Sequence, residues 1–172
     1  MRNSNRQWRL KRRPVGDIKP GDLDLSESPK PVPGENEILV RNIYLSLDPT
    51  NRIWMSDMEQ YMPPVQIGDV MRGGTLGVVE QSNAPGFAVG DIVIPGMGGW
   101  QDYTIGSASG PFPSQKLPTI PGVPLSTFMS ALGFTGATAY FGLLDLGQPK
   151  AGDTVVVSAA AGAVGQIVGQ IA

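Results

Sequence analysis

The residues best suited to chemistry lie near the end of the chain, in Ala159-Ala-Ala-Gly-Ala-Val-Gly165. They follow Thr154-Val-Val-Val-Ser158, a short β-branched run typical of a strand buried on both faces. The residues after them, Gln166 to Ala172, are predicted to form a helix. A strand, a turn of small residues and a helix N-terminus form the setting in which backbone amides bind a nucleotide diphosphate.

Two glycines give this turn its predicted role. Gly162 leaves room for a diphosphate to approach the backbone, and Gly165 lets the helix pack closely on its strand. The sequence departs from the G-x-G-x-x-G form because Ala160 stands at the first glycine position. A helix that packs closely on its strand without any ligand explains the same residues. The acidic residue that distinguishes NAD from NADP would lie beyond Ala172, so spacing does not choose the cofactor.

Composition excludes several other kinds of site. The chain contains no Cys and no His, which excludes disulfides, a nucleophilic Cys, a Ser-His-Asp triad and zinc sites of thiolates and imidazoles within these residues. Two carboxylate pairs, Asp22 with Asp24 and Asp57 with Glu59, lie in turn-like segments and are expected to be solvated, as is Asp145. The sequence therefore predicts no metal ligand and no catalytic side chain. Hydride transfer does not require a catalytic side chain, because the cofactor carries the reactive group.

Charge and hydropathy argue against nucleic acids and membranes as partners of this chain. The formal net charge of −2 predicts no general attraction to nucleic acid. The basic segment before Pro14 is interpreted as an edge strand with solvated charges around Trp8 and Leu10, rather than as a nucleic-acid patch. No signal peptide and no run of about 18 apolar residues are found, so we expect a cytoplasmic protein without a membrane partner.

The first part of the chain has short apolar runs separated by many glycines and prolines, of which the chain has 23 and 16. Strands are predicted over residues 37–46, 73–80, 90–94 and 100–105. Short strands with regular turn signals indicate a partly open antiparallel β-barrel.

The pattern changes near Pro121-Gly-Val-Pro124. Ser126 is expected to cap a helix over residues 127–132, and Thr135 a second one over residues 136–146 with Gly147 at its C′ position. We therefore expect a mixed β and α/β chain.

Residues 1–125 are predicted to form a catalytic-type β domain. Residues 126–172 are predicted to form connecting helices and the first β-turn-α of an incomplete nucleotide-binding domain. A complete dinucleotide-binding domain needs two βαβαβ halves, so the chain is interpreted as truncated.

Several motifs together narrow the family. They are Asn5-Arg-Gln-Trp8, Tyr44-Leu-Ser-Leu-Asp-Pro49 with Arg52, Gly90-Asp-Ile-Val93, Thr138-Ala-Tyr-Phe-Gly-Leu143 and the turn at 159–165. In this combination the chain resembles a zinc-free branch of the medium-chain dehydrogenase/reductase superfamily. That branch includes prostaglandin reductase, leukotriene hydroxydehydrogenase, curcumin reductase and plant 2-alkenal reductase.

The resemblance implies a fold and a reaction. The fold is a GroES-like domain followed by a Rossmann domain, in a homodimer when full-length. The reaction is NADPH-dependent reduction of the C=C bond of an α,β-unsaturated ketone or aldehyde. Hydride reaches the β-carbon, and donors near the carbonyl oxygen stabilise the negative charge that develops there.

The resemblance also assigns site residues. Gly162, Ala163, Val164 and Gly165 match the diphosphate-binding turn, and Thr138 matches a position close to the nicotinamide. A buried helix hydroxyl bonded to its own backbone is the alternative for Thr138.

The segment Asp48-Pro-Thr-Asn51 matches a loop that lines the substrate cleft. Many relatives carry Tyr-Met where this chain has Thr50-Asn51, so a pocket tyrosine is missing and a more open pocket is expected. Tyr44 and Trp54 nearby are interpreted as core residues rather than as ligand contacts.

Two other functions stay open at this point. One is a quinone oxidoreductase of a neighbouring zinc-free branch, although Asp48-Pro49 and residues 159–162 favour the ene-reductase. The other is a non-catalytic GroES-like binding module. In either case the 172-residue polypeptide alone is expected to have negligible turnover, since most of a cofactor domain is missing from it.

Overall fold

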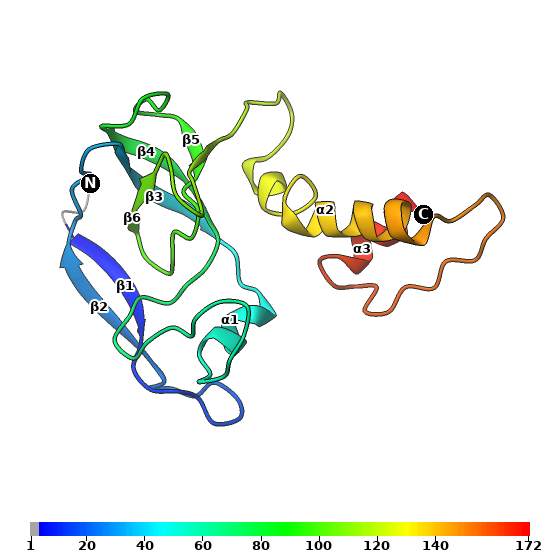
Figure 1. Cartoon of the computed structure of the whole chain (residues 1–172), viewed down its shortest axis with the longest axis horizontal. Coiled ribbons are helices and arrows are strands. Elements are labelled where there is room, and N and C mark those ends of the chain that lie inside the picture. Colours follow the sequence, from blue (N-terminus) through cyan, green and yellow to red (C-terminus); the bar gives the residue numbers. More distant parts are fainter. Residues whose placement is uncertain (1–3) are drawn as a thin grey trace. The chain divides into compact units, whose positions relative to one another are not determined.

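The computed structural model describes residues 4–172, which divide into two compact units between Thr119 and Ile120. Each unit is described by itself (Figure 1). The domain boundary after residue 125 and the roles assigned to the two parts stay predictions.

The first unit begins with an antiparallel ribbon of two strands, β1 (Ser4–Leu10) and β2 (Leu23–Pro29), in which Trp8 lies opposite Leu25. The predicted strand around Trp8 and Leu10 is therefore confirmed. Its partner, β2, was not predicted, because only Leu23-Asp-Leu25 shows apolar and polar alternation and the following Ser26-Glu-Ser28 is polar throughout.

A five-stranded antiparallel sheet forms the rest of the barrel, with the strand order β6-β3-β4-β5-β7. Strands β3 to β6 are labelled in Figure 1. Its strands are β3 (Glu37–Leu45), β4 (Thr75–Ser82), β5 (Ile92–Ile94), β6 (Tyr103–Ser107) and β7 (Gln115–Lys116). The four predicted strands are confirmed, with their ends shifted by up to three residues. The two-residue strand β7 carries no pattern that would have predicted it. The curled sheet confirms the expected partly open barrel.

Close packing in this sheet depends on one glycine of β4. Gly77 pairs with Asn42 where the register of β3 and β4 shifts between Asn42 and Tyr44. A Cβ at Gly77 would overlap the carbonyl oxygen of Arg41, so only glycine fits the irregular pairing.

Two apolar clusters form the core of the first unit. One joins the strands of the sheet through Ile38, Val40, Val79, Ala84 and Val93. The other lies beneath a short helix, α1 (Pro49–Trp54), and consists of Leu10, Trp54, Met55, Val65 and Met71. The second cluster links the N-terminal ribbon to the segment that the sequence assigned to a substrate cleft.

Asp22 corrects one expectation from the sequence. Its carboxylate was expected to be solvated, but the residue is 3% exposed and lies 2.5 Å from the Arg12 guanidinium. It also accepts a hydrogen bond of 2.7 Å from the Lys19 amide. These bonds, that of Arg12 first, lower the pKa of the Asp22 carboxyl against the opposing effect of burial. The turn before β2 therefore depends on an ionised carboxylate. Asp24, Asp57, Glu59 and Asp145 are exposed as expected.

The Asp22→Asn variant is expected to lose part of the acid sensitivity of the protein. A carboxyl whose pKa is lower in the folded state stabilises that state above its unfolded pKa of about 3.9, and this stabilisation is lost as pH falls through the lower folded pKa. Urea unfolding midpoints measured between pH 2 and pH 6 should thus fall less steeply with acid in Asp22→Asn. The matched control, Asp24→Asn, should keep the wild-type slope. An unchanged slope in Asp22→Asn would contradict this role.

Helices dominate the second unit (Figure 1). A 3₁₀ helix, η1 (Leu125–Met129), precedes α2 (Phe134–Tyr140), which continues directly into a π-helical turn, η2 (Phe141–Gly147). The last helix, α3 (Gly165–Ile171), packs against α2. The predicted helices are present. No helix among residues 4–172 has both the length and the apolar character needed to cross a membrane.

The predicted helix ends are wrong in detail. Pro124 and Gly133 occupy the N-cap positions instead of Ser126 and Thr135, and the Thr135 hydroxyl donates to the Ser130 carbonyl over 3.0 Å. At the other end, Gln148 and not Gly147 adopts the left-handed conformation, with φ of 46°. The π-helical turn extends the helix by one residue beyond the expected stop.

The predicted strand over Thr154 to Ser158 is also wrong. These residues belong to no sheet, Ser158 is already part of the following turn, and Val156 is 90% exposed. A β-branched run forms a strand only where another strand accepts its backbone hydrogen bonds. The described part of the second unit offers no such strand.

Candidate cofactor and substrate site

The proposed diphosphate turn connects residues 154–158 to α3. Ala159 adopts a left-handed conformation, with φ of 48°, and its carbonyl accepts a hydrogen bond of 2.8 Å from the Gly162 amide. The Gly162 carbonyl in turn accepts a bond of 3.0 Å from the Gln166 amide. Two successive backbone bonds therefore fold residues 159–166 into a compact turn that leads into the helix.

Both glycines fit the tight turn expected of a dinucleotide site. A Cβ at Gly165 would lie 2.9 Å from the Ala160 Cα and closer still to the Ala159 carbonyl oxygen. At Gly162 the same atom would lie 3.1 Å from that oxygen. The amides of Ala163 and Val164 donate no hydrogen bond within the described residues, so they are available to an anion. The residues fit a diphosphate, and their role stays a prediction.

Thr138 lies in α2, in the same unit as this turn. Its hydroxyl donates to the Phe134 carbonyl over 2.8 Å, as in the alternative considered from the sequence, but the residue is exposed rather than buried. The bond uses only the donor of the hydroxyl, so its oxygen can still accept. A contact with the nicotinamide stays a prediction.

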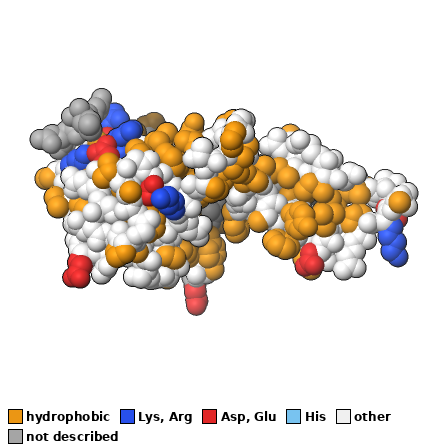
Figure 2. Space-filling view, turned by 90° about the horizontal axis from the view of Figure 1, so that it is seen from above, with side chains coloured by type: hydrophobic (Ala, Val, Ile, Leu, Met, Phe, Trp, Pro, Cys, Tyr) orange, Lys and Arg blue, Asp and Glu red, His pale blue; other side chains and the backbone are white. Residues whose placement is uncertain are grey.

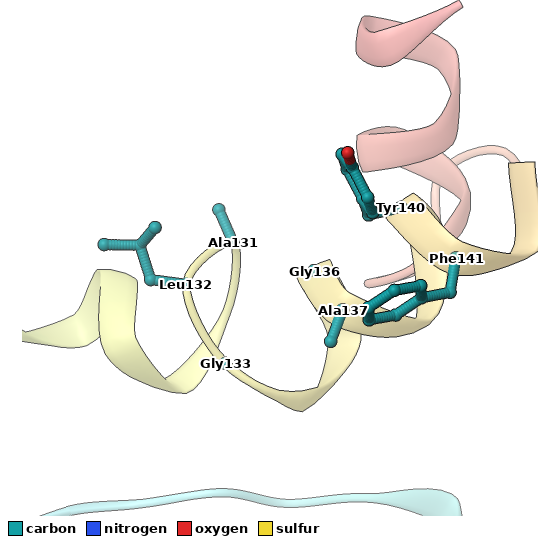
Figure 3. Close-up of a pocket in the computed structure, with 7 residues that line it drawn as sticks. All are labelled: Ala131, Leu132, Gly133, Gly136, Ala137, Tyr140 and Phe141. Atoms are coloured by element: carbon teal, nitrogen blue, oxygen red, sulfur yellow. The ribbon is translucent and has the colours of Figure 1, made fainter. Parts of the chain in front are cut away.

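An open cavity of about 300 Å³, which the sequence did not predict, lies at the start of α2 (Figure 3). Small residues form its floor and two rings, of Tyr140 and Phe141, form its side, packed edge to face with centroids 5.4 Å apart. A Cβ at Gly136 would overlap the Ala131 backbone, which explains the glycine at this position. The cavity is lined by Ala131, Leu132, Gly133, Gly136, Ala137, Tyr140 and Phe141.

The helices around this cavity leave much apolar surface uncovered. Figure 2 shows hydrophobic side chains gathered over the second unit. Phe134, Tyr140, Phe141 and Leu146 are all more than half exposed.

The four candidate substrate residues lie at the start of α1, in the first unit. Asp48 precedes the helix as its N-cap and Pro49 occupies the first turn, where its missing amide costs no hydrogen bond. Thr50 is half-buried, and its hydroxyl lies 2.8 Å from the Tyr61 hydroxyl. Asn51 is buried. The structure thus places these four residues together, and the cofactor candidates lie in the other unit.

Two aromatic residues near α1 differ from one another. Trp54 is buried, as expected, and its ring lies beneath the Arg72 guanidinium at 5.2 Å. Tyr44 was expected in the core, but it is 41% exposed, as are its neighbours Ile43 and Leu45 at this end of β3. The contact of Tyr61 with Thr50 was not predicted, because no periodicity relates a helix residue to a loop residue eleven positions later.

Known proteins share the sequence pattern of this chain. Residues 6–113 match the family model described as the N-terminal domain of oxidoreductase. The chain is 50% identical over 167 residues to the NADPH-dependent curcumin reductase of Escherichia coli, covering 97% of this chain and 47% of that protein. It is 40% identical over 175 residues to the NADP(+)-dependent 2-alkenal reductase of Nicotiana tabacum, covering 98% of this chain and 49% of that protein.

A solved structure gives the same picture. The crystal structure of CurA from Vibrio vulnificus in complex with NADPH matches with a TM-score of 0.86 and 48% identity, covering 96% of this chain and 48% of that one. The chain spans about half the length of these proteins. The likeness over nearly all of its residues confirms the expected fold class, a GroES-like domain followed by the start of a Rossmann domain.

Proposed function

Because this chain belongs to the zinc-free medium-chain dehydrogenase/reductase family, we propose that it is the N-terminal part of an NADPH-dependent reductase. Its substrates would be α,β-unsaturated ketones or aldehydes, reduced at the C=C bond. The observation that carries this proposal is the 50% identity to a curcumin reductase over 97% of the chain. A homodimer and a cytoplasmic location are part of the same proposal.

The residues of both units have definite parts in the proposed function. NADPH supplies the hydride when bound, and the turn at Gly162–Gly165 would hold its diphosphate on backbone amides. Thr138 would accept a hydrogen bond at the nicotinamide end. Asp48 to Asn51 would line the substrate cleft. No thiolate or imidazole is available for zinc in these residues, and the proposed reaction requires none.

The proposal predicts a defined selectivity for the full-length protein that contains this chain. With NADPH it should reduce an enone such as 4-phenyl-3-buten-2-one. The reaction is measured as the loss of NADPH absorbance, and the product is identified as the saturated ketone. NADPH should exceed NADH in kcat/KM by about tenfold or more, the effect of about 1.4 kcal/mol of transition-state binding.

Three outcomes would contradict the proposal. Reduction of quinones without reduction of enones would favour the neighbouring quinone oxidoreductase branch. Failure to bind either nucleotide would favour a binding module. Steady turnover by the isolated 172-residue chain would contradict the assignment of cofactor contacts to residues outside it.

A further inference from the structure

The hydrogen bond between Thr50 and Tyr61 joins the start of α1 to the loop that follows this helix. The two hydroxyl oxygens lie 2.8 Å apart, and either can be the donor. Tyr61 is 73% exposed, and Thr50 is the one hydrogen-bond partner of its hydroxyl among the described residues. The orientation of a largely solvent-exposed ring is thus fixed at its tip by a single threonine.

Buried polar contacts hold the threonine in place. The side chain of the next residue, Asn51, is 4% exposed. Its oxygen accepts from the Asp48 amide over 2.6 Å, and its nitrogen donates to the Arg72 carbonyl over 3.0 Å. Asn51 therefore attaches the first turn of α1 to the segment around Arg72, which precedes β4. This attachment fixes the position of Thr50.

The loop that carries Tyr61 is attached on both sides of the tyrosine. Before it, the Gln60 side chain donates to the Ile53 carbonyl over 3.2 Å. After it, the Arg72 guanidinium donates to the Pro63 carbonyl over 3.0 Å. The backbone at Tyr61 is therefore held close to α1, and the side-chain contact with Thr50 needs no further ordering of the loop.

Thr50 and Asn51 have different roles in these contacts. Asn51 attaches the first turn of α1 through its two side-chain hydrogen bonds. The Thr50 hydroxyl holds the Tyr61 hydroxyl. The two roles are coupled: Asn51 fixes the helix, and Thr50 fixes a tyrosine from the neighbouring loop.

We infer that Thr50 is a positioning residue that orients the Tyr61 phenol at the substrate cleft and so sets substrate affinity. This inference rests on the proposed function, since it takes the start of α1 as part of that cleft. Thr50 itself transfers no proton or hydride. It acts through Tyr61, whose hydroxyl is then presented in one orientation to the bound substrate.

The test compares Thr50→Val, Thr50→Ser, Tyr61→Phe and the double variant Thr50→Val/Tyr61→Phe in the full-length protein. Thr50→Val and Tyr61→Phe should each raise KM for an aryl enone about three- to tenfold, the effect of one hydrogen bond, with kcat changed less than about twofold. The double variant should be no worse than either single variant, because both remove the same contact. Thr50→Ser keeps the hydroxyl and should restore KM to within about twofold of wild type. The matched control, Thr119→Val, replaces an exposed threonine away from α1 and should change nothing.

A second measurement does not depend on activity. In urea unfolding of the 172-residue chain, the two single variants should lower the midpoint by similar amounts and the double variant should lower it no further. Additive shifts, or equal KM values in Thr50→Val and wild type, would overturn the inference while leaving the proposed function intact. Failure of the wild-type protein to reduce any enone would instead overturn the proposed function, and with it the role of Thr50 in substrate affinity.

Discussion

Replacing Gly165 by valine is expected to weaken NADPH binding by the full-length protein, with an apparent Kd raised by about 100-fold or more. A rise of that size corresponds to about 2.7 kcal/mol. The physical reason is steric: the new Cβ would overlap the Ala159 carbonyl and approach the Ala160 Cα, so the turn would have to open. Opening it would separate the amides that are proposed to bind the diphosphate. Titration of NADPH fluorescence measures the effect.

A matched control exists in the same helix. Gly169 lies four residues further along α3, and a Cβ there would meet no atom within 4 Å. Gly169→Val should therefore bind NADPH within about threefold of wild type, although it makes the same change of residue in the same helix. If Gly165→Val stays folded by circular dichroism and binds NADPH as tightly as Gly169→Val does, the turn is not the cofactor site.

Local pattern was sufficient to predict β1, β3, β4, β5 and β6, but not β2 and β7. The strand at 37–46 is rich in β-branched and aromatic residues, and β3 is present there because neighbouring strands β4 and β6 accept its hydrogen bonds. The run at 154–158 has an equally strong pattern but no neighbouring strand within its unit, and it remains outside any sheet and largely exposed. The same propensity therefore gives different results, because a strand is completed by its partners and not by its own residues.

Contacts between distant residues limited the prediction of the site. The glycines of the proposed diphosphate turn were identified from local spacing, since the constraint on them comes from residues only a few positions away. Asp22 was misjudged, because its ion pair with Arg12 joins residues ten positions apart that no local pattern relates. The Thr50–Tyr61 contact depends on how a loop returns to its helix, and the apolar cavity at Gly136 depends on how η1 meets α2. Sequence spacing predicts neither the path of a loop back to its helix nor the packing of one helix on another.

Truncation of a side chain in the core beneath α1 should lower the stability of the protein strongly. Leu10 is fully buried among Trp54, Met55, Val65 and Met71, so Leu10→Ala would leave a cavity that these side chains fill only in part. We expect a loss of about 2–5 kcal/mol in the free energy of unfolding. Urea denaturation of the 172-residue chain measures this loss directly.

The control for that variant lies on the paired strand. Leu25 in β2 is 51% exposed, and Leu25→Ala should cost less than about 0.5–1 kcal/mol because little of its surface leaves water on folding. The comparison tests more than burial: Leu10 is the fully buried residue by which the N-terminal ribbon, together with the partly buried Leu23, packs against the cluster that contains Trp54, the last residue of α1. If Leu10→Ala were no more costly than Leu25→Ala, the ribbon would not support the helix, and the position of Thr50 and Asn51 would depend on their own hydrogen bonds alone.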